Sequence, residues 1–143
     1  MHLNNLVKLG EEDLVKDVDL KYILRCILRL STTDILIYKA LLSSNPEDPP
    51  TVAELASVVG KSRSTVEKSL IKLIQLGLAT RRAVLTRRGG YTFVYYPVPI
   101  NEVKDRLATL LNAYYQISKD LIKGASIDEL IKSIEESGVD SNS

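Results

Sequence analysis

The apolar positions of this chain recur every three or four residues over most of its length, which predicts a mainly helical protein. Ser31, Thr51 and Ser62 each precede such a stretch, and a hydroxyl at that place is typical of a helix N-cap. Gly60 and Gly77 follow two of the stretches and predict helix ends. The helices predicted in the first half of the chain cover residues 20–30, 32–42, 52–59 and 63–76.

The same spacing predicts which side chains these helices bury. In the helix of residues 20–30, Cys26 is expected to be buried as a small hydrophobic residue rather than to act as a redox sensor. The side chains expected to be buried in the next helix and in the helix of residues 63–76 are Ile35, Leu36, Tyr38, Leu41 and Leu42, and Val66, Leu70, Leu73 and Ile74.

A β-hairpin is predicted after the fourth helix. Residues 78–86 and 91–98 are rich in strand-forming residues, and Gly89 and Gly90 between them permit a tight turn. An aromatic cluster in the second strand is open to two interpretations, stacking on nucleic-acid bases or packing on the inner face of the hairpin. Packing is favoured for these tyrosines, which are Tyr91, Tyr95 and Tyr96.

A long helix is predicted from Asn101 to about Lys123, and a shorter one after Ser126. Apolar residues in the long helix alternate at spacings of three and four, as in a coiled-coil heptad. Packing of this helix against its own domain is one explanation. Three successive repeats favour packing against a partner helix, and therefore a homodimer. Residues 20–30 could be part of the same interface. The predicted dimer-interface residues are Val103, Leu107, Leu110, Tyr114, Ile117 and Leu121.

The charged residues are distributed unevenly, although the net charge of the 143-residue chain is only +1. Residues 1–59 carry a net charge of −3, residues 60–91 a net charge of +7, and residues 92–143 a net charge of −3. A strongly basic segment between two acidic ones indicates an anionic partner, with nucleic acid as the first candidate. A solvated basic surface without a partner is the less favoured alternative.

Composition excludes several other classes of function. The only cysteine is Cys26 and the only histidine is His2, so a disulfide framework, a multi-cysteine zinc site and a histidine-based catalytic dyad are not expected. No apolar run reaches the roughly 18 residues of a membrane helix, and the N-terminus does not read as a secretory signal. We therefore expect a cytoplasmic protein of ordinary globular composition, with no cofactor, no metal and no membrane partner.

The predicted order of helix, short turn, helix and charged hairpin is that of a winged helix-turn-helix. Within residues 51–98, the segments Ser62-Arg-Ser-Thr-Val66, Gly77-Leu78 and Arg87-Arg-Gly-Gly90 carry a further signal. This stretch resembles the DNA-binding core of MarR-like and TrmB-like winged-helix transcriptional regulators. The resemblance implies a protein that binds double-stranded DNA and regulates transcription.

The expected fold class is mainly α with a small β-hairpin wing, a winged helix-turn-helix flanked by N- and C-terminal dimerisation helices. The expected regions are an N-terminal helical extension (1–30), a DNA-binding domain (31–99), a C-terminal dimerisation region (100–137) and a disordered tail (138–143).

In such a fold the second helix enters the major groove with its N-terminal residues against the bases. Arg63 there is suited to a bidentate pair with guanine, while Arg87 and Arg88 at the wing tip are suited to a narrow minor groove or the backbone. The predicted DNA-binding residues are Lys61, Ser62, Arg63, Ser64, Thr65, Lys68, Lys72, Arg81, Arg82, Arg87, Arg88 and Gly89.

Two other functions remain as alternatives. A winged helix can dock another protein, although an interaction module has no need for both Arg63 and the double-arginine tip. The protein could also bind chromosomal DNA without sequence preference. An enzyme has no support, because no nucleophile has a base beside it and no phosphate-binding loop is present. Any small-molecule effector is left open.

Overall fold

The computed structural model describes residues 10–138 and divides the chain into two compact units, Met1–Pro99 and Ile100–Ser143. Residues 1–9, with His2, and all of the predicted tail except Gly138 lie outside the described residues. The first unit contains α2 (Glu11–Leu14), α3 (Leu20–Tyr22), the π-helical turn η1 (Ile23–Ile27), α4 (Thr32–Leu42), α5 (Val52–Val59), α6 (Arg63–Gln75), β1 (Ala79–Leu85) and β2 (Tyr91–Pro97), and the second contains α7 (Ile100–Gly124) and α8 (Ile127–Glu136).

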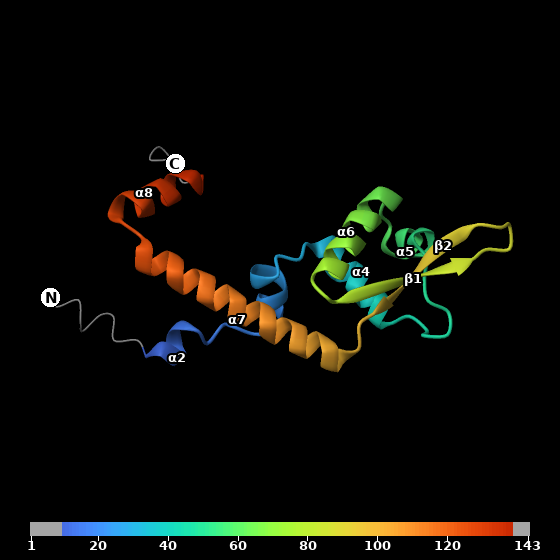
Figure 1. Cartoon of the computed structure of the whole chain (residues 1–143), viewed down its shortest axis with the longest axis horizontal. Helices are drawn as coiled ribbons and strands as arrows, with labels where there is room; N and C mark the ends of the chain where they lie inside the picture. The colour runs from blue at the N-terminus through green and yellow to red at the C-terminus, as the bar shows by residue number, and fades with distance from the viewer. Residues whose placement is uncertain (1–9, 139–143) are drawn as a thin grey trace. The chain divides into compact units, whose positions relative to one another are not determined.

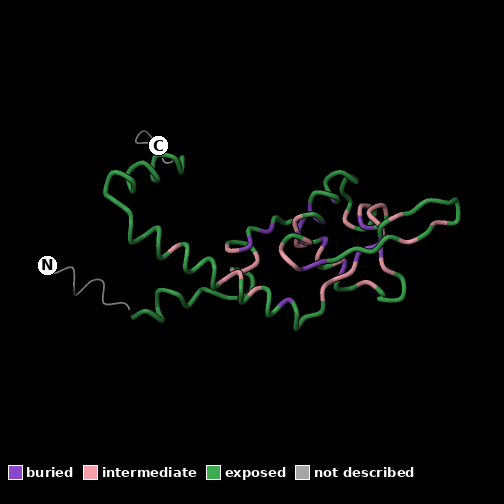
Figure 2. Tube along the Cα trace, in the orientation of Figure 1, coloured by how far each residue is buried: buried purple, intermediate pink, exposed green. Residues whose placement is uncertain are grey.

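The core of the first unit lies where α4, α5 and α6 meet one another and the base of the hairpin. The two strands form one antiparallel sheet, and the hairpin extends away from the helices (Figure 1). Figure 2 shows most of the buried residues gathered at this junction. The mainly helical fold with a β-hairpin wing is therefore confirmed. The largest fully buried side chains are Ile37, Leu41, Leu55, Val66, Leu70, Leu73 and Leu78.

The predicted N-caps are confirmed. Ser31 Oγ accepts a hydrogen bond from the Asp34 amide at 3.1 Å, and the Asp34 carboxylate accepts one from the Ser31 amide at 2.9 Å. Thr51 and Ser62 likewise accept hydrogen bonds from the amides three residues further on. These side chains satisfy amide groups that have no partner within the helix, which fixes where α4, α5 and α6 begin.

The segment of residues 20–30 differs from the single helix predicted for it. The Leu28 amide donates to the Ile23 carbonyl at 2.9 Å, five residues back, and Arg29 then adopts a left-handed conformation with φ 58°. A π turn adds a residue to the helical cycle and so rotates the side chains that follow. Leu28 and Leu30 are buried while Cys26, which lies within the π turn, is exposed, so the predicted burial of Cys26 is wrong.

The buried face of α4 is also narrower than predicted. Leu41 is buried as expected, but Leu36 and Leu42 are exposed, and Ile37 is fully buried although it was not expected to be. The buried residues of α4 are spaced three and four apart, beginning at Asp34, and α5, α6 and β2 all pack on this helix. The apolar sequence of α4 is too uniform for its composition alone to show which face is covered.

A buried carboxylate joins α4 to α6. Asp34 is only 4% exposed, and it accepts hydrogen bonds from the Ser69 hydroxyl and, at 2.9 Å, from Lys72 Nζ. Lys72 Nζ also donates to the backbone carbonyl of Arg29. Burial, the largest effect, raises the pKa of Asp34, but the bonds from Ser69, Lys72 and Ser31 together hold that pKa below its ordinary value of 3.8.

The second unit consists of two amphipathic helices, α7 and α8. Ser126 caps α8 by accepting a hydrogen bond from the Glu129 amide at 3.2 Å. Between residues 10 and 138, no helix has both the length and the apolar character required to span a bilayer. Most residues of this unit are exposed in the single chain (Figure 2), including many large apolar ones. These are Ile100, Tyr114, Tyr115, Ile117, Leu121, Ile122, Ile127, Leu130, Ile131 and Ile134.

The link between α4 and α6 can be tested with Asp34→Asn. The substitution keeps the shape but leaves the Lys72 ammonium without its carboxylate. We expect the free energy of unfolding at pH 7 to fall by about 2–3 kcal/mol, less than for a fully buried pair because Lys72 is partly exposed. Urea denaturation measures the change, with the exposed loop variant Asp48→Asn as control; a loss no greater than that of the control would contradict the assigned role.

The lowered pKa of Asp34 predicts that the stability of the protein depends on pH. Because folding lowers the pKa of Asp34, the unfolded chain binds the proton more readily. The stabilisation is therefore fully present above the ordinary value of 3.8 and is lost as the pH falls through the lower pKa of the folded state. The difference in stability between the wild type and Asp34→Asn should shrink over this acid range, as measured by urea denaturation at successive pH values, and should be constant at higher pH.

Candidate nucleic-acid interface

A three-residue turn between α5 and α6 determines how α6 is presented. Gly60 adopts φ 68°, a left-handed conformation that costs glycine little, and its amide closes the end of α5 on the Ala56 carbonyl at 2.9 Å. A Cβ atom at Gly60 would meet nothing within 4 Å, so the backbone conformation alone calls for glycine there. The Lys61 amide also donates to the Ala56 carbonyl at 3.1 Å, and Ser62 begins α6 immediately afterwards.

Helix α6 has one buried face and one free face. Val66, Ser69, Leu70 and Leu73 are buried. The polar side chains of residues 63–68, in contrast, are all exposed. They are Arg63, Ser64, Thr65, Glu67 and Lys68.

Hydroxyl groups form a small network at the start of α6. Ser62 Oγ accepts from the Thr65 amide at 3.2 Å and lies 2.9 Å from Thr65 Oγ1 and 3.2 Å from Ser64 Oγ. Ser62 was predicted to cap the helix and to be able to contact DNA as well, and the cap is confirmed. The network orders the three side chains on the surface where the helix N-terminus attracts anions.

The hairpin ends in an exposed arginine pair. Leu85 pairs with Tyr91, and the chain turns between them through Gly89 and Gly90, whose φ angles are 81° and 83°. Thr86 stabilises this turn because its hydroxyl donates to the Gly89 carbonyl at 2.8 Å. The turn leaves both tip arginines, Arg87 and Arg88, exposed.

The two arginines of β1 have different partners, as strand alternation predicts. The Arg81 guanidinium lies 4.0 Å from the centre of the Phe93 ring, in a cation–π contact. Arg82 donates to the Tyr96 hydroxyl at 2.7 Å. Aromatic residues of β2 therefore hold both guanidinium groups in place while the groups remain accessible.

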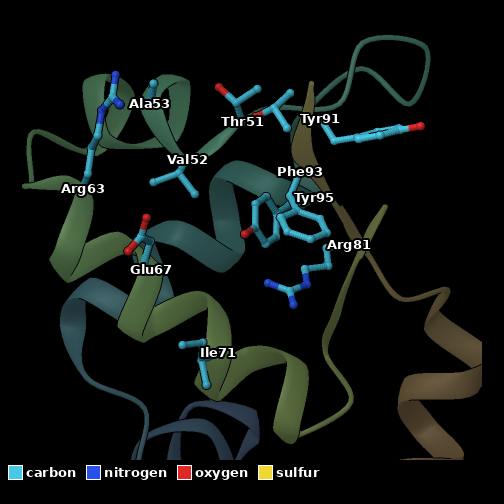
Figure 3. A pocket seen from close by; sticks show the side chains of 11 residues that line it. Thr51, Val52, Ala53, Arg63, Glu67, Ile71, Arg81, Tyr91, Phe93 and Tyr95 are labelled. Atoms are coloured by element: carbon cyan, nitrogen blue, oxygen red, sulfur yellow. The ribbon is translucent and has the colours of Figure 1, made fainter. Parts of the chain in front are cut away.

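A hollow of about 630 Å³ lies between α6 and the hairpin (Figure 3). Helix α6 contributes Arg63, Glu67 and Ile71, and the hairpin contributes Arg81 and Phe93. The structure thus brings together an arginine of each of the two predicted DNA-binding elements, which are 18 positions apart in the sequence. The remaining lining residues are Thr51, Val52, Ala53, Tyr91, Thr92 and Tyr95.

Some predicted site residues are placed differently. The ammonium of Lys72 bonds to Asp34 and to the Arg29 carbonyl, on the side of α6 that faces α4. Tyr95 is buried as expected and Tyr96 is half-buried, but Tyr91 is 76% exposed, so packing on the hairpin does not account for Tyr91.

Sequence reasoning assigned no role to Glu67 or Phe93, although both line the hollow. For Glu67 the signal was available, because it lies four positions after Arg63 and therefore on the same face of α6. For Phe93 the cross-strand register decides which side chain it meets, and the sequence did not supply that register.

The exposed cations of this surface have no ionic partner within residues 10–138. The two ion pairs found there are Lys72–Asp34 and Lys132–Glu136. The charges of Arg63, Lys68 and the hairpin arginines are therefore available to an anion. The described part of the chain also contains no group of three or more His, Cys, Asp or Glu residues placed to bind a metal ion.

The tight turn, the exposed second helix and the arginine-tipped hairpin define a winged helix-turn-helix. The family described as the sugar-specific transcriptional regulator TrmB matches residues 24–101, more than half of the chain. The chain belongs to this family of transcriptional regulators, which confirms the predicted resemblance.

Relatives in archaea cover most of the chain. It is 36% identical over 114 residues to the uncharacterized protein MJ1082 of Methanocaldococcus jannaschii, a match covering 80% of this chain and 84% of that protein. A second protein of that organism, MJ1503, is 23% identical over 110 residues, 77% of this chain and 81% of its own length.

Two solved structures share the fold. A possible transcriptional regulator from Methanosarcina mazei superposes with a TM-score of 0.62 at 19% identity, covering 76% of this chain and 91% of that one. The ST1889 protein of Sulfolobus tokodaii gives a TM-score of 0.53 at 26% identity, covering 68% and 93% respectively. The first supports the winged fold and nothing finer, because its identity is low.

The cap of α6 is open to a direct test. Ser62→Ala removes the acceptor for the Thr65 amide, so we expect a loss of about 1 kcal/mol in the free energy of unfolding. Ser64→Ala, two residues away on the same surface, should change stability by less than half of that amount. Thermal or urea denaturation of both variants checks the assignment, and equal losses would show that the Ser62 hydroxyl is not the effective cap.

Proposed function

We propose that this protein is a dimeric regulator that binds double-stranded DNA, with α6 in the major groove and the hairpin on the backbone or in the minor groove. The observation that carries the proposal is that Arg63 and Arg81, from two separate elements, both line one open hollow. Both arginines are exposed and have no ionic partner within residues 10–138, as an approaching polyanion requires. The shape of this surface and its charge thus support the same partner.

The first turns of α6 supply contacts of two kinds. Arg63, at the first helical position, can reach a guanine edge, and Ser64 and Thr65 can donate to bases or phosphate oxygens. Lys61 and Lys68 are exposed on either side of this turn and suit phosphates. The helix N-terminus adds its own attraction for a phosphate.

The hairpin supplies contacts with no sequence preference of their own. Arg87 and Arg88 are at its tip beside Gly89, whose lack of a side chain leaves room for a close approach. Arg81 and Arg82 are held by aromatic rings along the strands, which lowers the entropic cost of fixing them against DNA.

Lys72 is better placed as a support for α6 than as a DNA contact. Its ammonium already bonds to Asp34 and to the Arg29 carbonyl. Releasing it toward DNA would leave a buried carboxylate unpaired, at a cost greater than a single phosphate contact returns.

The dimer is supported by the exposed apolar face of the second unit. Of the predicted interface residues, Val103 is buried, Leu107 and Leu110 are half-buried, and Tyr114, Ile117 and Leu121 are exposed in the single chain. Apolar residues at heptad spacing on a 25-residue helix are typical of a seam between two helices. A two-fold dimer would present two α6 helices to a palindromic site.

The proposal names no effector ligand, and its last part concerns the cellular location. Residues matched by the TrmB family, 24–101, comprise the winged helix and the segment before it, so the sugar in the family description is not carried over to this chain. We propose a chromosome-associated location in the cytoplasm because that is where the proposed partner is.

Binding to duplex DNA, and the role of the wing in it, can be tested together. Fluorescence anisotropy should show wild-type binding that weakens steeply with salt. Arg87→Ala plus Arg88→Ala should weaken binding to every duplex similarly and reduce the salt slope by about 0.9 for each phosphate that the wing no longer neutralises.

The matched control removes two positive charges elsewhere, as Lys119→Ala plus Lys123→Ala in α7. If both double variants lose affinity equally, net charge rather than the wing is responsible. If the wild type binds no duplex even at low salt, the DNA-binding proposal fails and protein docking by the winged helix becomes the better explanation.

If α7 forms the dimer seam, a single charged residue placed in that seam should separate the two subunits. Ile117→Lys places an ammonium in the proposed seam, at a side chain 61% exposed in the single chain, so the monomer fold should be unaffected. Light scattering should show the wild-type mass halved. Gln116→Lys, one residue away and outside the heptad positions, should leave the dimer intact; a dimer that survives Ile117→Lys would contradict the seam.

A further inference from the structure

Glu67 is an acidic residue within a strongly basic surface. It is the one acidic residue in the segment 60–91, which has eight basic ones. It is exposed on the second turn of α6, within the surface that the proposed function assigns to a polyanion. A carboxylate brought close to DNA phosphates is repelled, so its presence there has to be offset by a favourable contact.

Glu67 does not find that contact within the described chain. Neither of the ion pairs in residues 10–138 includes it. Arg63 is four residues earlier on the same helix, but it makes no ion pair with Glu67. Arg81, across the hollow, is stacked on Phe93 instead. Glu67 lines the hollow together with Arg63 of the same helix and with Arg81 and Phe93 of the hairpin (Figure 3).

The major groove offers a carboxylate one kind of favourable partner. Base edges there carry two amino donors, cytosine N4 and adenine N6, and a carboxylate, which only accepts hydrogen bonds, is the usual partner of cytosine N4. Adenine presents its amino group beside the N7 acceptor, which would repel the second carboxylate oxygen. A negative side chain in this place therefore selects for cytosine.

Resting on the proposed function, we infer that Glu67 is a specificity-determining residue that accepts a hydrogen bond from the N4 amino group of a cytosine in the major groove. Arg63 is separated from it by four residues, about 6 Å along the helix axis. That length corresponds to roughly two base-pair steps of 3.4 Å. The recognised half-site therefore contains a guanine read by Arg63 and, within about two base pairs of it, a cytosine read by Glu67.

Glu67 also limits binding to the wrong duplex. Where no amino donor meets the carboxylate, its desolvation and its repulsion by the phosphates remain uncompensated. The eight basic residues of this segment attract any duplex, and the single acid makes that attraction depend on sequence. Glu67 thus lowers affinity for random DNA while it preserves affinity for the cognate site.

The test is selection of binding sites from a pool of randomised duplexes by the full chain, followed by sequencing. For the wild type we expect an enriched half-site with the guanine and cytosine described above. In Glu67→Gln, the amide can form a bidentate pair with adenine, so the preferred base at that one position should change from cytosine to adenine. In Glu67→Ala, the preference at that position should disappear while the others remain.

Affinity measurements on the selected duplex complete the test. Replacing that cytosine should weaken wild-type binding roughly five-fold or more, and should affect Glu67→Ala by less than two-fold. Glu47→Gln, an exposed loop change that removes the same charge, serves as control and should keep the wild-type motif.

Each other outcome is decisive. If Glu67→Gln and Glu67→Ala enrich the wild-type motif unchanged, or lose every position equally, Glu67 does not read a base and the inference is overturned. If the wild type binds duplex DNA but enriches no motif, the inference fails while DNA binding stands. If the wild type binds no duplex at all, the proposed function fails first and this inference with it.

Discussion

The orientation of α6 depends on one buried carboxylate. The Asp34 carboxylate accepts a hydrogen bond from the Ser31 amide at the start of its own helix and also accepts bonds from Ser69 and Lys72 of α6. Apolar contacts alone would let two helices slide or rotate against each other at little cost, whereas these directional bonds fix the register. Burying Asp34 is unfavourable by itself, and it is tolerated because each of its oxygens has a donor. A surface that recognises base edges needs its side chains held to within fractions of an ångström, and this cluster holds α6, the helix proposed to carry them.

The basic residues of this surface have two different roles: one supports the position of α6, and the others remain accessible to an anion. The ammonium of Lys72 bonds to Asp34 and holds α6 against α4, so Lys72 is not one of the cations available to an anion. Arg81 and Arg82 are restrained by Phe93 and Tyr96 but remain open to solvent. Positive charge that is both exposed and pre-ordered binds an anion with less loss of entropy than free side chains would. Aromatic strand residues therefore serve the surface by positioning arginines, which is a different role from base stacking.

The sequence predicted the fold well because its signals are local. The caps at Ser31, Thr51 and Ser62 and the glycines of the hairpin act within a few residues, and local rules are enough to place them. Where the outcome depended on distant contacts, prediction failed: the buried polar pair of Asp34 and Ser69 joins residues 35 positions apart. The prediction that Cys26 is buried in a regular helix also failed, because the sequence of residues 23–27 does not indicate a π turn.

Affinity and specificity place opposite demands on a basic surface. Arginines at the hairpin tip attract every duplex alike, and this attraction falls as salt screens it. A regulator that had only such contacts would be distributed over the whole chromosome. Specificity requires contacts that penalise the wrong sequence, and a short-range hydrogen bond from a base to a carboxylate does so with little dependence on salt. If Glu67 reads a base as we propose, the surface around the hollow contains both elements, and raising the salt concentration would reduce binding to random DNA more than it reduces discrimination between bases.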